Sequence, residues 1–243
     1  MIDTGSPSLA QPDYWWYRVR AELLRRALGA YVPAGGVILD VGSADAPSAG
    51  WLADRGRVVP MDIDPRGLEA GGVCGSAEQL PFRSESLDVV AAFDVLEHCH
   101  RPGLALAEMV RVLRPGGLLA LSVPAYRWAW TDHDVHNGHV TRYTRRRLVD
   151  AVEQSGAQVV RATYMFMGTF PFFAADRLRT RLKESRRDIG TPPGEMSDVL
   201  TLPEVSPLTE KVLLGASQVD RTLLGKVDLP FGSSVVCAAR KSS

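Results

Sequence analysis

The sequence predicts an α/β protein built on a doubly wound, mostly parallel sheet. The first observation is an apolar run at residues 37–41 that passes into a small-residue turn at Gly42, as a buried strand feeding a loop would. The second is the alternation of such runs with helical patterns, which is typical of parallel strands joined by crossover helices. The third is that acids, Asp40 and Asp62, lie at the ends of two strands. In open α/β sheets the carboxyl ends of the strands bind ligands.

The length of 243 residues and the hydrophobic content of 45% favour one main domain with an appendage. We expect four segments along the chain. They are an N-terminal tail and helix (1–35), a ligand-binding core (36–165), a helical cap insertion (166–230) and the last strand of the core (231–243).

The charge balance and the cysteines exclude several classes of protein. Acidic and basic residues number 28 each, so no nucleic-acid partner is expected. Cys74, Cys99 and Cys237 are scattered, which argues against a disulfide framework and indicates a reducing, cytoplasmic compartment. Residues 1–13 do not resemble a signal peptide, and the apolar stretch 165–175 is too short to span a membrane.

Hydrophobic periodicity and breakers give the expected elements in order. Helices are expected at 14–28, 47–54, 102–114, 144–156, 169–182 and 208–224, and strands at 37–41, 57–62, 73–74, 87–93, 118–123, 158–165 and 233–239. About 65 residues separate the last two strands, far more than a hairpin loop needs.

Several short motifs occur in a characteristic order over about 90 residues. They are the turn at Gly42, the acid Asp62, and residues 80–82, 88–90, 95–98 and 112–117. In this order the chain resembles the class I S-adenosylmethionine-dependent methyltransferases of the small-molecule type. The resemblance implies the Rossmann-like methyltransferase fold, with seven strands of which the last is antiparallel, and a cofactor lying across the carboxyl ends of the first half of the sheet.

The spacing and residue type at Asp62 also agree with a ribose site, since a carboxylate can accept two hydrogen bonds from a diol. The alternative is that this acid only begins a turn. The resemblance implies the remaining cofactor contacts. Asp40, Gly42 and Ser43 match the motif that holds the methionine part, Asp62 the ribose, Ile63, Ala77 and Glu78 the adenine, and Asp94, Val95 and Leu96 the segment under the methionine end.

All five histidines lie in residues 98–100 or 133–139, and both places follow strands that end at the expected ligand edge. A neutral imidazole can take a proton from a substrate hydroxyl during methyl transfer. We expect His139 to act as base or orienting residue, with His133 as second candidate and Asp134 beside them. The equal alternative is that His139 and Arg142 only fix the loop.

The pattern of Asp134, His139, Arg142 and Tyr143 resembles a bacterial methyltransferase subgroup that often acts on sugars, glycolipids or secondary metabolites. Substrate contacts are expected from Trp128, Trp130, Arg142 and Tyr143. The histidines at 133, 136 and 139 recur every three residues, but residues 137–138 break helical continuity, so no metal site is expected.

The predicted function is O-methylation of a small-molecule or lipid-linked glycan acceptor. A noncatalytic scaffold is one alternative, because Ala44 and Ala46 replace glycines usual in the family and Ser76 replaces an acid. A nicotinamide-dependent oxidoreductase is another, although the turn lacks the G-x-G-x-x-G spacing. The basic cap helix predicts either a solvated face or peripheral contact with the inner face of a membrane. No oligomeric state is predicted.

Overall fold

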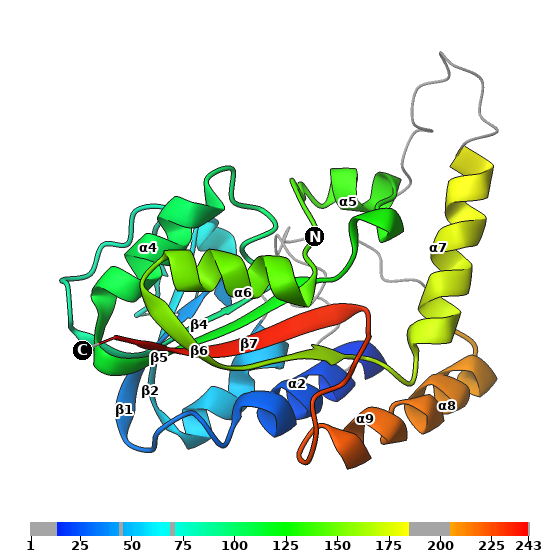
Figure 1. Cartoon of the computed structure of the whole chain (residues 1–243), viewed down its shortest axis with the longest axis horizontal. Helices are drawn as coiled ribbons and strands as arrows, with labels where there is room; N and C mark the ends of the chain where they lie inside the picture. The colour runs from blue at the N-terminus through cyan, green and yellow to red at the C-terminus, as the bar shows by residue number, and fades with distance from the viewer. Residues whose placement is uncertain (1–13, 44–45, 69–70, 185–204, 243) are drawn as a thin grey trace.

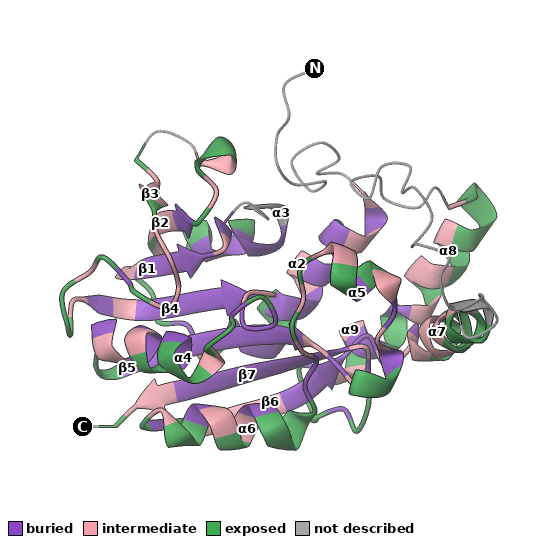
Figure 2. Ribbon diagram, turned by 90° about the horizontal axis from the view of Figure 1, so that it is seen from above, coloured by how far each residue is buried: buried purple, intermediate pink, exposed green. Residues whose placement is uncertain are grey.

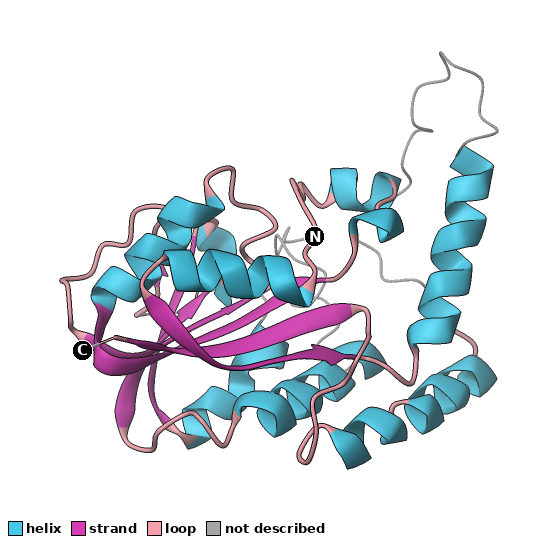
Figure 3. Cartoon of the chain, viewed as in Figure 1, coloured by secondary structure: helices cyan, strands magenta, loops and turns pink. Residues whose placement is uncertain are grey.

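In a computed structural model of the chain, the structure describes residues 14–43, 46–68, 71–184 and 205–242. Its centre is a seven-stranded sheet of order β3-β2-β1-β4-β5-β7-β6, in which β7 runs antiparallel to both neighbours (Figures 1 and 3). The strands are β1 (Gly36–Val41), β2 (Gly56–Asp62), β3 (Val73–Cys74), β4 (Leu87–Phe93), β5 (Leu113–Pro124), β6 (Ala157–Met165) and β7 (Ser234–Lys241). This confirms the predicted sheet.

Helices cover both faces of the sheet (Figure 1). On one face lie α4 (Pro102–Val112) and α6 (Arg145–Gln154), and on the other lie α2 (Trp15–Leu28) and α9 (Gln218–Leu223). Helices α2, α4 and α6 begin or end where the sequence predicts. Thr144 caps α6 by accepting a hydrogen bond from the amide of Arg147, and Pro102 occupies the first turn of α4.

The central strands are buried on both faces, as the continuous apolar runs of parallel strands predict (Figure 2). The short α3 (Ala46–Ala49) and the 3-10 turn η2 (Gly50–Asp54) stand where one short helix was predicted. None of the helices in the described part of the chain combines the length and the apolar character needed to cross a bilayer.

The start of β5 differs from the prediction. The strand begins at Leu113, which pairs with Leu87, and not at Leu118 after the glycines. Gly116 adopts a φ of +74°, and the register shifts before Leu118 pairs with Val89. The Pro-Gly-Gly run therefore lies inside the strand as an irregularity, whereas the sequence suggested a break between helix and strand.

The insertion between β6 and β7 contains α7 (Phe170–Glu184), α8 (Pro207–Ala216) and α9. The single helix predicted over 208–224 is divided at Ser217, which is followed by the buried carboxylate of Asp220. That carboxylate accepts hydrogen bonds of 2.8 Å from the amides of Met167 and Gly168, which ties the second half of the helix to the end of β6. The predicted N-terminal tail, Ala44 and residues 185–204 lie outside the described residues, and the domain boundaries stay predictions.

Candidate functional site

The carboxyl ends of β1, β2 and β4 meet at one edge of the sheet, where the predicted cofactor residues lie. Gly42 adopts a φ of +76°, and its amide donates to the carbonyl of Met61 at 2.8 Å. A Cβ atom added at Gly42 would lie 2.6 Å from Cγ2 of Val95. Only glycine fits this turn, because a side chain would be strained by the backbone and would collide with the loop after β4.

The residues around this turn fit a nucleoside with a methionine tail. Ser43 is buried, and its hydroxyl has no hydrogen-bond partner among the described residues. Asp62 ends β2, is buried and accepts a hydrogen bond from the amide of Asp64 at 2.9 Å. The next side chain, Ile63, is 74% exposed. The buried hydroxyl of Ser43, the carboxylate of Asp62 and the exposed side chain of Ile63 thus follow one another along the chain at the strand ends. Asp40, near the end of β1, is also buried at this edge of the sheet.

The predicted adenine segment forms a tight turn. The hydroxyl of Ser76 accepts a hydrogen bond from the amide of Glu78 at 3.2 Å, so this serine holds the turn. The carboxylate of Glu78 accepts from the amide and the Nε of Arg101, both at 2.8 Å, and the amide's hydrogen bond is the main cause of its lowered pKa. Glu78 therefore joins this segment, which also contains Ala77, to the start of α4.

Asp94, directly after β4, adopts a left-handed conformation with a φ of +58°, which Asp tolerates better than most residues. Its carboxylate accepts from the hydroxyl of Ser122 at 3.0 Å and forms an ion pair of 2.7 Å with Arg20. Arg20 comes from α2, is fully buried and lies 5.3 Å from the ring centre of Trp16. The sequence did not point to Arg20, because its position on the buried face of α2 carries no motif.

Glu97 is the second residue that sequence reasoning missed as a site residue, although it belongs to a quoted motif. It is 1% exposed, and neither carboxylate oxygen has a hydrogen-bond partner among the described residues. Burial, and then the negative charge of Asp94, raise the pKa of Glu97 well above its usual range. Its backbone carbonyl accepts from the amide of Val140 at 2.7 Å, so this segment touches the histidine-rich loop.

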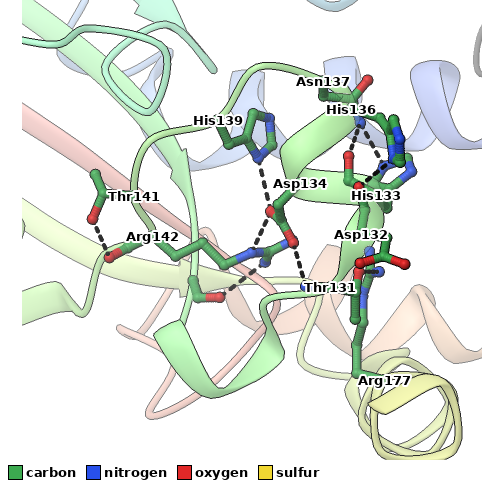
Figure 4. Close-up of polar contacts among 11 residues, drawn as sticks. Thr131, Asp132, His133, Asp134, His136, Asn137, His139, Thr141, Arg142 and Arg177 are labelled. Carbon is green, nitrogen blue, oxygen red and sulfur yellow. Dashed lines mark hydrogen bonds and ion pairs between the residues drawn. The ribbon is translucent and has the colours of Figure 1, made fainter. Parts of the chain in front are cut away.

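That loop is built around the short helix α5 (Asp132–His136) and the buried carboxylate of Asp134 (Figure 4). Oδ1 of Asp134 lies 2.8 Å from Nδ1 of His139 and 2.7 Å from Nε of Arg142, while Oδ2 accepts from the amide of Thr131 at 3.0 Å. Burial alone would raise the pKa of Asp134, but the hydrogen bonds from His139 and Arg142 outweigh it and lower the pKa. An ionised carboxylate therefore orients the His139 ring.

Of the residues predicted to bind substrate, Arg142 and Tyr143 are buried, and their polar groups are bonded within the chain. Arg142 also donates to the carbonyl of Ala125 at 3.1 Å, and the hydroxyl of Tyr143 donates to the carbonyl of Leu96 at 3.4 Å. These contacts hold the loop against the sheet, and the predicted contacts of Arg142 and Tyr143 with substrate stay predictions. Burial raises the pKa of Tyr143 to about 12, with the charge of Glu97 adding to the effect.

The aromatic part of the loop is more open. Trp128 is 37% exposed and stacks on Tyr126 with ring centres 5.9 Å apart, whereas Trp130 is partly buried. Helix α7 is joined to this region, because Arg177 donates to the hydroxyl of Thr131 at 2.6 Å and Arg181 to the carbonyl of Trp128 at 2.7 Å. The insertion thus lies against the loop that carries the predicted catalytic residues.

The candidate base His133 has a different environment from His139. Its Nε2 lies 2.9 Å from the side-chain amide nitrogen of Asn137. The surrounding protein partly removes water from the His133 ring, and this desolvation is the main reason that its pKa is lowered. The positive charge of Arg177 lowers the pKa further. Of the two histidines, only His139 has a carboxylate bonded to its ring among the described contacts, and its ring centre lies 4.8 Å from that of His98.

Residues 39–121 match the family described as Methyltransferase domain. An uncharacterized methyltransferase of Mycobacterium leprae is 31% identical over 164 residues, which cover 60% of this chain and 57% of that protein. The chain thus spans a little over half the length of this curated relative.

Solved structures show the same fold. A chain of the complex between the Haloferax volcanii Trm112 methyltransferase activator and a putative methyltransferase has a TM-score of 0.59, at 15% identity and coverage of 97% of this chain and 93% of that chain. A phosphoethanolamine N-methyltransferase of Haemonchus contortus, in complex with S-adenosyl-L-methionine, has a TM-score of 0.56, at 16% identity and coverage of 92% and 52%. The sheet and its flanking helices are those of the Rossmann-like methyltransferase fold.

Proposed function

We propose that this chain, whose residues 39–121 match the methyltransferase domain family, is an S-adenosylmethionine-dependent methyltransferase that methylates a hydroxyl of a small molecule. The acceptor class we favour is a sugar, a glycolipid or a secondary metabolite, free or lipid-linked. We expect the protein to work in the cytoplasm, with no nucleic acid as partner.

The observation that carries this proposal is a chain of contacts across the strand ends. Val95 lies against Gly42 in the predicted cofactor turn. Two and three residues later, the Glu97 carbonyl bonds to the amide of Val140, and the His98 ring lies against that of His139. Residues 95–98 therefore join the predicted cofactor turn to the only described histidine whose ring bonds to a carboxylate.

When bound, S-adenosylmethionine supplies a methyl group that is already activated by its sulfonium. What remains for the chain is to hold the acceptor in line with that methyl group, exclude water and take the hydroxyl proton. Asp62 would hold the ribose hydroxyls, and the turn of Asp40, Gly42 and Ser43 would hold the methionine end. The Ala77–Glu78 turn would close on the adenine beside Ile63.

His139 is suited to take the proton. Asp134 fixes the ring through Nδ1, which leaves Nε2 available to the acceptor hydroxyl, and the negative charge of Asp134 stabilises the imidazolium that forms. Arg142 and Tyr143 would act as positioning residues that hold Asp134 and the loop. Trp128 would supply an apolar face for the acceptor, with Trp130 behind it.

The test is a methyl-transfer assay with S-adenosylmethionine that carries a deuterated methyl group. Fractionated bacterial sugars, glycolipids and secondary metabolites are incubated with the protein, and the products are read by mass spectrometry. The expected result is a product whose mass shift corresponds to one deuterated methyl on an oxygen. Transfer to nitrogen or carbon would refute the acceptor class, and transfer to nothing while the cofactor binds would favour the scaffold alternative.

A further inference from the structure

Three side chains that can bind metals come together where the strand-end segment meets the histidine-rich loop. Glu97 and His98 follow β4, and His139 follows α5. Their ligand atoms, one from each residue, all lie within 4.8 Å of one another. This set differs from the histidines at 133, 136 and 139 that the sequence suggested and rejected. It joins residues about 40 positions apart, so local spacing could not reveal it.

Glu97 is the part of the cluster that most needs a partner. The residue is almost completely buried, yet both carboxylate oxygens are without a hydrogen-bond partner among the described residues. An unpaired buried polar group costs on the order of 1–3 kcal/mol, and more when it is charged. The charges of Arg20 and Arg142 act on Glu97, but neither side chain hydrogen-bonds to its carboxylate. Arg20 forms its ion pair with Asp94 through one terminal nitrogen, and Arg142 pairs with Asp134.

His139 is oriented as a metal-binding histidine usually is. Its Nδ1 bonds to Asp134, a carboxylate that can only accept hydrogen bonds and that Arg142 and the amide of Thr131 keep ionised. The proton of the ring therefore lies on Nδ1, and the lone pair of Nε2 is free to bind a cation. In zinc sites, a histidine that binds the metal commonly donates its other ring N–H to a carboxylate in this way.

His98 completes the set from the solvent side. The planes of the His98 and His139 rings meet at 81°. His98 is exposed to solvent, whereas Glu97 is buried. Two imidazole nitrogens and one carboxylate oxygen are a ligand set found in catalytic zinc and non-haem iron sites, which keep further positions open for water or substrate. Mg²⁺ and Ca²⁺ prefer oxygen ligands, so two imidazoles favour a transition metal.

We propose that Glu97, His98 and His139 form a binding site for a divalent transition metal ion, of which Zn²⁺ is the representative, with open positions toward the histidine-rich loop. The site is argued only from this cluster, although it shares His139 with the proposed methyl transfer. If both hold, the open positions would receive the acceptor oxygen, and His139 would position the metal instead of taking the proton itself.

The test is equilibrium dialysis of the untagged, metal-stripped full chain against Zn²⁺, with zinc per chain read by atomic emission. Every variant carries Cys74→Ser, since that exposed thiol is an unrelated zinc ligand. We expect stoichiometric zinc in the Cys74→Ser chain and a loss of affinity of at least 100-fold in Glu97→Gln and in His98→Ala. The matched control is His100→Ala, an exposed histidine two residues away and outside the cluster, which keeps full zinc binding.

Absence of zinc binding in the Cys74→Ser chain, or binding that Glu97→Gln and His98→Ala leave unchanged, overturns the proposal, and so does loss of zinc in His100→Ala. Should Glu97→Gln fail to fold by circular dichroism, His98→Ala decides, because that ring is on the surface. The dialysis is carried out without S-adenosylmethionine, so zinc binding is measured independently of methyl transfer. Zinc bound without methyl transfer therefore refutes only the proposed function, and methyl transfer by a chain without zinc refutes only the metal site.

Discussion

Gly42 and Val95 touch across two neighbouring loops, so closely that a Cβ atom on Gly42 would lie 2.6 Å from Cγ2 of Val95. The contact joins the turn after β1 to the segment after β4, the two segments predicted to hold the methionine part of the cofactor. In the sequence, Gly42 stands out as a turn that matches the motif holding the methionine part of the cofactor. The structure adds that this glycine is required for the packing of the two loops, so a change at Gly42 affects the fold as well as binding.

We predict that Gly42→Ala destabilises the protein by more than its backbone strain alone, which is roughly 1–2 kcal/mol for a residue in this conformation. Gly116→Ala is the matched control, because Gly116 has a φ of +74° and no atom within 4 Å of the added Cβ. Urea unfolding measures both. The double variant Gly42→Ala/Val95→Ala should recover the part of the destabilisation that exceeds the backbone strain. Equal losses in the two single variants would show that the contact with Val95 carries no weight.

Arg20 gives the second prediction. It is fully buried and paired with Asp94, whose side chain is 28% exposed. Arg20→Met should therefore cost about 2–4 kcal/mol in the free energy of unfolding, near the lower part of the range for breaking a buried ion pair, because solvent still reaches Asp94. Arg18→Met on the same helix, whose 3.7 Å pair with Glu210 is exposed, should change it by less than about 1 kcal/mol. Similar effects of both variants would contradict this account.

The third prediction concerns acid stability. The carboxylate of Glu108 accepts from Arg111 at 2.7 Å and from the amide of Leu80 at 2.9 Å, and the hydrogen bond from Arg111 is the main cause of its lowered pKa. A carboxyl whose pKa is lowered by folding adds stability above its unfolded pKa of about 4.3, and this stability is lost as the pH falls through the folded value.

Glu108→Gln should therefore cost about 1 kcal/mol at pH 7 and progressively less as the pH falls below about 4. Urea unfolding of the wild type and the variant over this pH range measures the difference. A cost that stays constant from neutral to acid pH would show that the charge of Glu108 does not stabilise the fold.

Turnover tests the pair of Asp134 and His139. Once an acceptor is known, His139→Ala should lower kcat by roughly 10²–10⁴-fold, while the affinity for S-adenosylmethionine stays unchanged. His136→Ala, a histidine of the same loop whose Nδ1 lies 2.5 Å from the carbonyl of Asp132, should retain its turnover. Full activity of His139→Ala across the pH range would exclude His139 as the base.

Much of the fold could be predicted because its signals are local. Apolar runs, acids at strand ends and the Thr144 cap are visible in neighbouring residues, and most strands and helices stand where those signals indicate. The predictions for β5 and for the helix over 208–224 were wrong in detail. Pairing of Leu113 with Leu87 and the bonds of Asp220 to residues 167–168 are long-range contacts that override the local pattern.

The candidate site was predicted in part for the same reason. The clustering of histidines pointed to the right loop, but the partners of their rings could not be assigned from spacing. Arg20 and Glu97 are charged residues in positions that look ordinary in the sequence, and only the tertiary structure reveals that they are buried. Arg142 and Tyr143 are buried where the loop packs against Ala125 and Leu96, and their predicted contact with substrate stays a prediction.

The central claim, that the strand ends bind S-adenosylmethionine, is tested most directly by calorimetric titration of the full chain with S-adenosylmethionine and with NAD. We predict binding of S-adenosylmethionine alone, weakened roughly 10–100-fold by Asp62→Ala, which removes hydrogen bonds to a charged group worth about 1.5–3 kcal/mol. Asp54→Ala, which removes an exposed carboxylate outside the strand ends, should leave binding unchanged. Binding of NAD alone, binding of neither, or normal binding by Asp62→Ala would contradict the account.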